Sequence, residues 1–560
     1  MADIVIRGGV VVDGTGAAPF EADVAMAGGR ITAIGQVPER GATEIDAHGK
    51  LVTPGFVDIH THYDGQAVWD SHLAPSAWHG VTTAVMGNCG VGFAPCRAAD
   101  RDKLIELMEG VEDIPGPILH EGLKWSWESF PEYLDALAAR PRDMDICALL
   151  PHGAVRVHVM GERALNLENA NQADIAAMRA ITADAVRAGA FGVSTSRTIS
   201  HKTLKGDPTP TLRAQEDELR GLAQGLRDGG GGLLELVSDW NTPDPATEFA
   251  MVRRVVEATG QPVVFSLTAR HDRTEAWKEL LALSDGAAAS GLPIRPVFPP
   301  RPIGILLGLE GSQNPFSGCV SYKEIAHLPA ADRAAAMADP ARRARILSED
   351  RIAGSNFPLI SRLVFERMFP FGDPPDYAPP ASASIAAMAA REGRCAEEVA
   401  YDLLIADAGR GFIFAPLTNF ADYTLSASAE CLRHPNAIAG LSDATIPDTI
   451  AAPEVTEPLP AIPVDPPTLA MTFRINDGPL GGREGKKVTS RQIRDRLFKE
   501  TEGNVAIKVK ISEEVDAFEV AGRGELQLGV LIEQMRREGF ELTIGRPRVL
   551  TRDNPETGER

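Results

Sequence analysis

Long apolar runs are missing from this sequence of 560 residues, since none approaches the roughly 18 consecutive apolar residues of a membrane-spanning helix. The N-terminus, residues 1–6, lacks the basic and apolar regions of a secretory signal. We therefore expect a cytoplasmic protein with no membrane partner. A basic excess is missing too, because 56 Lys and Arg stand against 77 Asp and Glu, a net charge of -21. The whole chain is not expected to bind nucleic acid independently of base sequence.

Cysteines are few, and none has the C-x-x-C spacing of a pair. The six are Cys89, Cys96, Cys147, Cys319, Cys395 and Cys431. Their scatter excludes a disulfide framework and a cysteine-rich zinc knuckle. A cysteine that matters here is expected to be a ligand or a nucleophile, and the others are expected to be small core residues.

The first 444 residues predict a barrel preceded by a small β domain. Residues 1–50 contain short apolar segments separated by glycine-rich turns, which predict an antiparallel β unit. From Leu51 onward, apolar runs alternate with Ala-rich amphipathic stretches, the texture of repeated strand–helix units in a (β/α) barrel. The predicted strands are Val52–Ile59, Gly80–Met86, Ile146–Leu150, Ala190–Ser194, Leu233–Val237, Pro262–Leu267, Pro293–Phe298 and Ala437–Leu441.

The barrel pattern is interrupted once and then ends. Residues 299–435 lie between the seventh and eighth predicted strands, and this length indicates an inserted subdomain or lid within a barrel of residues 51–444. A Pro-rich linker follows at 445–467. Residues 468–560 have the order strand, helix, strand, strand, helix, strand, which predicts a small α+β domain.

The strongest chemical signal is the segment from Pro54 to His62, an apolar strand that ends in His60-Thr61-His62. Side chains two residues apart share one face of a strand, so both imidazoles can point into one site at the mouth of a barrel. Two imidazoles on a rigid strand end provide half of a zinc-type site. On the motif alone, incidental histidines explain the pattern equally well.

The surrounding motifs favour the metal site. Residues 1–62, with 11–16, 28–35 and 45–62 as their most specific stretches, resemble the opening of an amidohydrolase-superfamily enzyme. Within that superfamily, Gly87-Asn88-Cys89-Gly90, Pro151–Arg156 and Gly189–Arg197 resemble the N-acyl-D-amino-acid deacylase (D-aminoacylase) group. The resemblance implies a metal-assisted amide hydrolase of amidohydrolase barrel type, acting on a small N-acylated amino acid.

The same resemblance implies roles for individual residues. Cys89 corresponds to a cysteine metal ligand, in keeping with the preference of zinc for thiolates. Asp443, in Gly440-Leu441-Ser442-Asp443, corresponds to the family's catalytic aspartate, a general base and acid. His152, Arg156 and Arg197 correspond to substrate-side polar groups. Packing around the exit of the third strand is the competing interpretation of His152 and Arg156.

Two metal histidines of the family have no counterpart in this chain. Val237 and Leu267 occupy the ends of the fifth and sixth predicted strands, where the family has histidine. Glu235 and His271 are the alternative ligands, although Glu235 comes two residues early and His271 lies beyond its strand. We therefore expect one ion, zinc or another divalent metal, held by His60, His62 and Cys89.

A second resemblance begins near the eighth predicted strand. Residues 437–548 are similar to the TypA/BipA group of translational GTPases, through Ala439–Ile450, Pro467–Phe473, Thr489–Leu497 and Gly522–Leu528. The resemblance implies a ferredoxin-like domain. No GTPase domain or phosphate-binding G-x-x-x-x-G-K-[ST] motif occurs, so nucleotide hydrolysis is not expected. Four basic residues of one predicted helix could contact ribosomal RNA or form an ordinary solvated face: Arg491, Arg494, Arg496 and Lys499.

The chain thus looks like parts of two unrelated genes joined near residues 436–444. The leading hypothesis is an amide hydrolase with a foreign tail. The alternatives are a ribosome-associating fragment and a chimeric product with little activity. Asp443 could come from either parent. In the family, a C-terminal segment returns to complete the small β domain, so we expect its absence to leave edge strands and apolar surface uncovered.

Overall fold

A computed structural model provides the structure of most of the chain. It describes residues 2–203, 205–240, 244–311, 313–352, 363–440, 469–476, 485–503, 507–512, 517–522 and 525–549. The predicted Pro-rich linker and Asp443 both lie outside the described residues. Among the described helices, none is both long and apolar enough to cross a bilayer.

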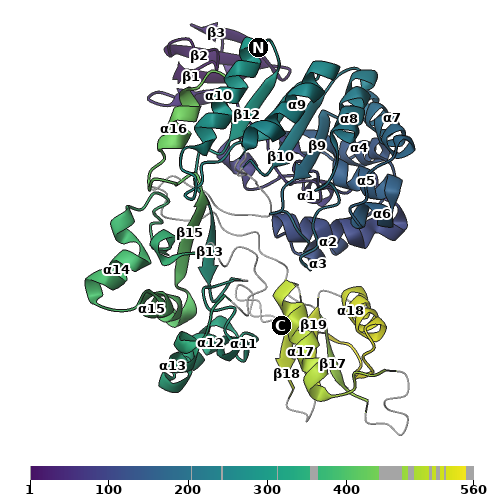
Figure 1. The fold of residues 1–560 in the computed structure, drawn as a ribbon, viewed down its shortest axis with the longest axis vertical. Helices are drawn as coiled ribbons and strands as arrows, with labels where there is room; N and C mark the ends of the chain where they lie inside the picture. Colours follow the sequence, from purple (N-terminus) through teal and green to yellow (C-terminus); the bar gives the residue numbers. More distant parts are fainter. Residues whose placement is uncertain are drawn as a thin grey trace.

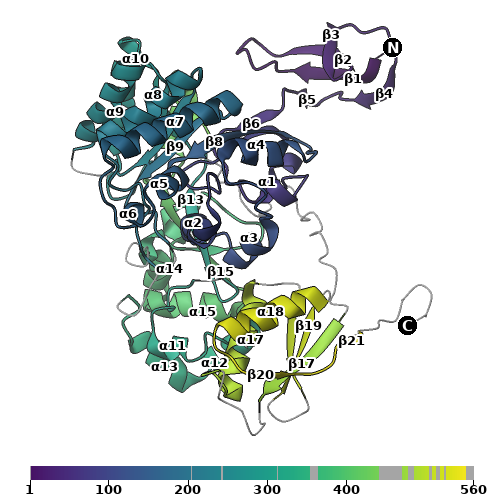
Figure 2. The same ribbon diagram turned by 90° about the vertical axis from the view of Figure 1, so that its right-hand side faces the viewer.

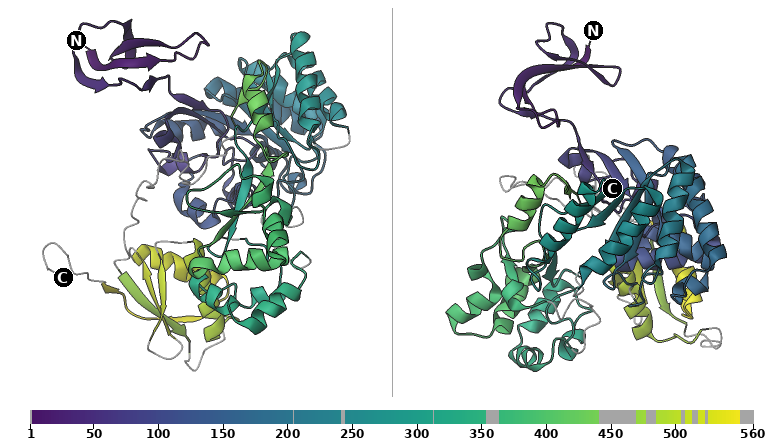
Figure 3. Two further views of the ribbon diagram at one scale, coloured as in Figure 1. Left: turned by 90° about the vertical axis from the view of Figure 1, so that its left-hand side faces the viewer. Right: turned by 45° about the horizontal axis from the view of Figure 1, so that its top comes forward.

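The N-terminal residues form a sheet of five strands at one end of the molecule (Figures 2 and 3). The strands are β1 (Ala2–Val11), β2 (Phe20–Ala27), β3 (Arg30–Gly35), β4 (Gly41–Asp46) and β5 (Leu51–Val52). β2 pairs antiparallel with β1 and β3, whereas β4 and β5 both run parallel to β1. The expected purely antiparallel unit is therefore wrong. The alternating pattern defines the faces of a strand, but not which strand becomes its neighbour.

The single predicted strand Val52–Ile59 is two strands in the structure. Its first residue, Val52, belongs to β5 of the small sheet, and Phe56–Asp58 form β6 of the large one. Pro54 lies between them and has no N–H to donate to a ladder. At Gly55 the backbone passes so close to Thr82 that an added Cβ would lie 2.1 Å from its Cγ2. This short segment connects the two sheets.

The large sheet has eight parallel strands in the order β16-β12-β11-β10-β9-β8-β7-β6, which confirms the predicted barrel-type fold. The remaining strands are β7 (Val81–Met86), β8 (Asp145–Pro151), β9 (Gly192–Arg197), β10 (Leu233–Ser238), β11 (Val263–Ser266), β12 (Ile294–Phe298) and β16 (Ile438–Ala439). The sheet curls until its two ends approach each other. This is seen at Gly440, next to β16, where an added Cβ would lie 2.3 Å from Cγ1 of Ile59, next to β6.

The helices of residues 66–289 alternate with these strands, and the later ones, from residue 172 on, cover the outside of the sheet (Figure 1). They are α1 (Gln66–Trp69), α2 (Arg101–Glu112), α3 (Gly116–Gly122), α4 (Phe130–Ala138), α5 (His152–Met160), α6 (Glu162–Leu165), α7 (Gln172–Ala188), α8 (Glu216–Gly229), α9 (Pro245–Thr259) and α10 (Ala276–Ala289). Local sequence sets the ends of α7: Asn171 and Asp174 form a capping box, and Gly189 ends the helix at φ +116°. Gly221 and Gly225 let α8 approach α7 closely.

Residues 299–435 contain their own sheet and hydrophobic core. The sheet order is β13-β15-β14, all antiparallel. The elements are β13 (Ile303–Gly308), α11 (Val320–Lys323), α12 (Ala330–Met337), α13 (Pro340–Ser348), β14 (Phe369–Phe371), α14 (Ile385–Glu392), α15 (Ala396–Gly409), β15 (Phe412–Thr418) and α16 (Ser426–Arg433). Phe316, Met337 and Tyr401 lie in this core.

The C-terminal residues form the predicted ferredoxin-like domain. Its strands and helices are β17 (Leu469–Ile475), α17 (Ser490–Gly503), β18 (Lys508–Ile511), β19 (Ala517–Gly522), α18 (Glu525–Arg537), β20 (Leu542–Ile544) and β21 (Arg548–Val549). The antiparallel order is β18-β19-β17-β20, with β21 also paired to β17 (Figure 2). Phe473, Leu497 and Leu531 pack in a core of its own.

The close packing of neighbouring strands yields a stability prediction at Gly192, the first residue of β9. A Cβ there would lie 2.0 Å from the Leu233 carbonyl oxygen, so Gly192→Ala forces the backbones of β9 and β10 apart. We expect the free energy of unfolding to fall by about 1–3 kcal/mol. Gly286→Ala is the matched control, because Gly286 lies in α10 with no atom within 4 Å of an added Cβ. That substitution should stabilise the protein by up to about 1 kcal/mol.

Chemical denaturation of both variants checks this prediction. Equal unfolding free energies for the Gly192 and Gly286 variants would show that β9 and β10 are not packed as described.

Candidate metal centre

His60 and His62 lie side by side directly after β6. Thr61 between them is held to the neighbouring strand, because its N–H and its hydroxyl both donate to the Val85 carbonyl, at 3.0 and 2.9 Å. Since side chains alternate along an extended chain, both imidazoles project to the opposite side. Their ring centroids are 5.4 Å apart. Both side chains are buried, at 3% and 1% exposure.

Cys89 completes a group of three potential ligands. Its Sγ lies 3.2 Å from Nε2 of His60. One donor atom each from His60, His62 and Cys89 can be chosen so that all three lie within 4.8 Å of one another. Among the described parts of the chain, this is the group of three or more such residues that could hold a metal ion. Two imidazoles and a thiolate are a donor set suited to zinc.

The Cys89 segment requires glycine on both sides. Gly87 and Gly90 have φ values of +83° and +70°. A Cβ at Gly87 would lie 2.3 Å from the Leu149 carbonyl oxygen, and one at Gly90 would lie 3.0 Å from the backbone of Ser196. Any larger residue would push the segment off strands β8 and β9. The sequence Gly-Asn-Cys-Gly is thus the local condition for placing the thiol beside His60.

Two buried carboxylates hold this segment. Oδ2 of Asp64 accepts a hydrogen bond from the Gly87 N–H at 3.0 Å, and Oε2 of Glu235 accepts one from the Cys89 N–H at 3.1 Å. Burial raises the pKa of Asp64 to about 6, and the nearby His62 and the Gly87 N–H oppose this rise only in part. Glu235 is therefore linked to the cluster by the hydrogen bond that it accepts from the backbone N–H of Cys89.

A third carboxylate near the cluster escaped the sequence analysis. Oε2 of Glu112, the last residue of α2, lies 3.2 Å from Nε2 of His62. No local motif marks this position, because Glu112 is one of several acidic residues on an amphipathic helix. Its proximity to His62 depends on how α2 packs after β7.

A cavity of about 580 Å³ occupies the interior of the barrel and reaches the cluster. His60, Asn88 and Glu235 line it together with mostly aliphatic side chains from the strands, among them Val85 and Leu149. Its volume is in the range of small-molecule sites, about 300–1,000 Å³. Of the two histidines, His60 lines this space and His62 is not among its lining residues.

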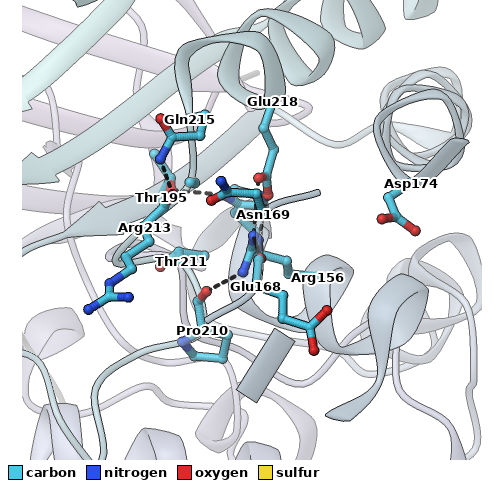
Figure 4. Close-up of polar contacts among 12 residues, drawn as sticks. Arg156, Glu168, Asn169, Asp174, Thr195, Pro210, Thr211, Arg213, Gln215 and Glu218 are labelled. Carbon is cyan, nitrogen blue, oxygen red and sulfur yellow. Dashed lines mark hydrogen bonds and ion pairs between the residues drawn. The ribbon is translucent and has the colours of Figure 1, made fainter. Parts of the chain in front are cut away.

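His152 and Arg156 form a buried network rather than lining this cavity. Nε2 of His152 lies 2.9 Å from Oε1 of Glu218, and Nδ1 lies 2.9 Å from Oγ1 of Thr195. Nε of Arg156 donates to the same Glu218 oxygen at 2.6 Å, and Nη1 donates to the Pro210 carbonyl at 2.6 Å (Figure 4). His152 and Arg156 are both 0% exposed.

The position of Thr195 shows on which side of the barrel wall this network lies. Ser194 and Thr195 are neighbours on β9, so their side chains point to opposite faces. Oγ of Ser194 accepts a hydrogen bond from the Gly90 N–H at 3.0 Å, on the side of the Cys89 segment. Thr195 and His152 therefore lie on the helix-covered side, away from His60 and His62.

The other predicted site residues also lie outside the three-residue cluster. Nε of Arg197 donates to Oε1 of Glu248 at 2.8 Å, so this guanidinium is engaged by α9. His271 is partly buried, and its burial and the charge of Arg367 lower its pKa. Asp443 falls outside the described residues. The structure thus brings together His60, His62 and Cys89, with Glu235 bonded to the backbone of Cys89.

Comparison with known proteins supports both halves of the sequence analysis. A model of the amidohydrolase family matches residues 43–457. Among solved structures, the N-acyl-D-glutamate deacylase from Bordetella bronchiseptica, complexed with zinc and a phosphonate inhibitor, is 23% identical with a TM-score of 0.50. The match covers 79% of this chain and 76% of that one. At this identity the likeness concerns the fold.

A different protein matches a smaller part of the chain. The large ribosomal subunit assembly factor BipA of Synechocystis sp. is 56% identical over 117 residues, and that of Salmonella typhimurium is 57% identical over 117 residues. These residues are 21% of this chain but only 20% and 19% of the two relatives. The chain thus spans about a fifth of the length of these relatives, and it joins segments similar to two different proteins.

The buried network around Glu218 yields a stability prediction. Glu218→Gln removes the charge that pairs with Arg156 and leaves a buried guanidinium without its counter-ion. We expect the free energy of unfolding at pH 7 to fall by about 3–5 kcal/mol. Glu216→Gln on the same helix is the control, because Glu216 pairs with Arg254 near the surface. It should cost less than about 1 kcal/mol.

The pH dependence of this difference follows from the pKa of Glu218. Burial alone would raise that pKa, but the hydrogen bonds and charges of His152 and Arg156 lower it from 4.5 to about 2. A lowered folded pKa gives stability that is complete above the unfolded pKa and is lost as the pH falls toward the folded one. The difference between wild type and Glu218→Gln should therefore shrink between about pH 4.5 and 2. A difference that is constant over this range in denaturation experiments would contradict the assignment.

Proposed function

The chain belongs to the amidohydrolase family, and we propose that its barrel is a metal-assisted hydrolase of N-acylated amino acids. The observation that carries this proposal is the buried cluster of His60, His62 and Cys89 at the end of the first two barrel strands. Active sites of such barrels collect at the carboxyl ends of the strands.

His60, His62 and Cys89 are the residues that would hold the ion, zinc or another divalent metal. Such an ion, when bound, polarises a carbonyl group and lowers the pKa of water. Three protein donors leave a position for water or substrate, as in catalytic rather than structural zinc sites. Val237 and Leu267 bring no donor atoms, which supports a single ion rather than two.

Proton transfer in this proposal belongs to Asp443. A carboxylate can take a proton from water and then give it to the nitrogen of the leaving amino acid. The amide C–N bond is cleaved, and the products are a free carboxylate and a free amino acid. The choice of N-acylated amino acids as substrates rests on the motifs Gly87–Gly90 and Gly440–Asp443, which resemble the deacylase group.

Zinc analysis tests the metal site. After metal removal and zinc reconstitution, we expect about one zinc per chain, and less than roughly a tenth of an equivalent for Cys89→Ser. Cys96→Ser is the matched control: Cys96 is also buried, but burial raises the pKa of its thiol to about 12 and it does not belong to the cluster. Release of amino acid from N-acyl substrates should follow the zinc content. Equal zinc in both serine variants would refute the site.

A second proposal concerns the C-terminal domain and rests on its high identity to BipA. We infer that the C-terminal segment, residues 445–560, binds the ribosome through basic residues of α17. Of the basic residues predicted there, Arg496 is paired with Glu538 at 2.8 Å, and Arg494 lies 5.8 Å from the ring centroid of Phe498. Arg494 is thus a better candidate than Arg496 for a contact with RNA phosphate.

Co-sedimentation of the full chain with ribosomes tests this second proposal. We expect the protein in the ribosomal pellet at low salt and its release as salt rises, because phosphate contacts are salt-dependent. Arg494→Glu should weaken binding and reduce the salt slope by about one contact. Recovery of the wild-type chain only in the supernatant at low salt would exclude ribosome binding and favour a chimeric chain without this function.

A further inference from the structure

We propose that Glu235 is a positioning residue, which fixes the Cys89 thiol by accepting the hydrogen bond of the Cys89 N–H. This inference rests on the proposed metal site. The alternative role of Glu235 is that of a direct metal ligand, and the experiments below distinguish the two roles. The argument concerns the backbone of residues 87–90, hereafter the cysteine loop.

The cysteine loop has a backbone conformation that requires support. Cys89 has φ +55°, and it carries a side chain in a region that favours glycine. A non-glycine residue in this region is strained, and it persists only where the surrounding structure imposes it. The position of the thiol depends on this backbone angle. Whatever holds the loop therefore also places Sγ at 3.2 Å from His60.

Side chains from three separate parts of the chain, the turn after β6 and strands β9 and β10, hold the loop through its N–H groups. Asp64 accepts from Gly87 at 3.0 Å, Glu235 accepts from Cys89 at 3.1 Å, and Ser194 accepts from Gly90 at 3.0 Å. The three acceptor oxygens therefore all come from residues that are far from the loop in the sequence. The bond from Glu235 is the one made directly to the metal-ligand residue.

The location of Glu235 is unusual for a carboxylate. It lies in the middle of β10 between the buried residues Leu234 and Leu236, and it is itself only 3% exposed. Burying a carboxylate is costly unless it is hydrogen-bonded or paired, so an aliphatic residue would be the ordinary occupant of this strand position. The hydrogen bond to the Cys89 N–H gives the glutamate a specific function there.

The register of the sheet explains why Glu235 reaches the loop. Glu235 pairs directly with Ser194 on β9, so the two side chains emerge next to each other on the same face. Their oxygens meet the N–H groups of two consecutive residues, Cys89 and Gly90. Two neighbouring barrel strands thus present a pair of acceptors that matches the loop. A one-residue shift of β10 would remove one of them.

Hydrogen exchange in the metal-free protein tests the proposal without any metal or substrate. Glu235→Met keeps the length of the side chain but removes the acceptor, whereas Glu235→Gln keeps an acceptor oxygen. We expect amide exchange in a peptide covering residues 85–91 to be about tenfold faster in the Met variant, and within about threefold of wild type in the Gln variant. Unchanged exchange in α7 shows that each variant is folded. If Glu235→Met does not fold, Glu235→Ala replaces it.

Zinc affinity of the same variants, measured by competition with a chromophoric chelator, then separates the possible roles. Loss of a residue that orients a ligand typically weakens metal binding about 10–100-fold. We expect this loss for Glu235→Met and near wild-type affinity for Glu235→Gln. Glu248→Gln is the control, because it removes a carboxylate that is bonded to Arg197 and Ser238 and not to the loop.

The outcomes distinguish this inference from the proposed function. Amide exchange of residues 85–91 that is as slow in Glu235→Met as in wild type would overturn the positioning role. Weak zinc binding in Glu235→Gln, together with amide exchange as slow as in wild type, would also overturn the positioning role, because the carboxylate would then act on the ion itself. Fast exchange in Glu235→Met together with no zinc binding by wild type would support the positioning role and refute the proposed metal function.

Discussion

Two hydrogen bonds from Thr61 to the Val85 carbonyl fix the part of the molecule on which its chemistry depends. They join the end of β6 to β7, and they turn His60 and His62 together to the opposite side. Cys89 then follows β7 at the same end of the sheet, so its thiol meets His60. A shift of one residue in this pairing would send both histidines to the helix side. The metal centre is thus a consequence of strand register.

The sequence is sufficient to predict most of the fold, because the relevant signals are local. The strand from Gly80 to Met86, the alternation of strands with amphipathic helices and the ferredoxin-like order all agree with the structure. Pairing between distant strands is not a local property, and β4 and β5 accordingly run parallel to β1 against expectation. Pro54 separates β5 from β6, but the apolar residues on both sides of it favour one continuous strand.

In the candidate site too, the sequence predicts what local motifs mark and not what depends on contacts between distant segments. His60, His62 and Cys89 carry motifs, and the structure places their donor atoms together. The sequence does not show which side of the barrel wall His152 faces, because this depends on Thr195 and on the docking of Glu218 from α8. The roles of Glu112 and Glu235 depend on contacts across the barrel. Neither residue has a local pattern that reveals such contacts.

X-ray absorption at the zinc edge tests the central claim most directly, since it reports the donor atoms of a bound ion. For the zinc-reconstituted full chain, the account predicts one sulfur at about 2.3 Å and two imidazole nitrogens at about 2.0–2.1 Å. The sulfur contribution should be absent in Cys89→Ser and retained in Cys96→Ser. A zinc ion surrounded only by oxygen and nitrogen in the wild-type chain would contradict the account.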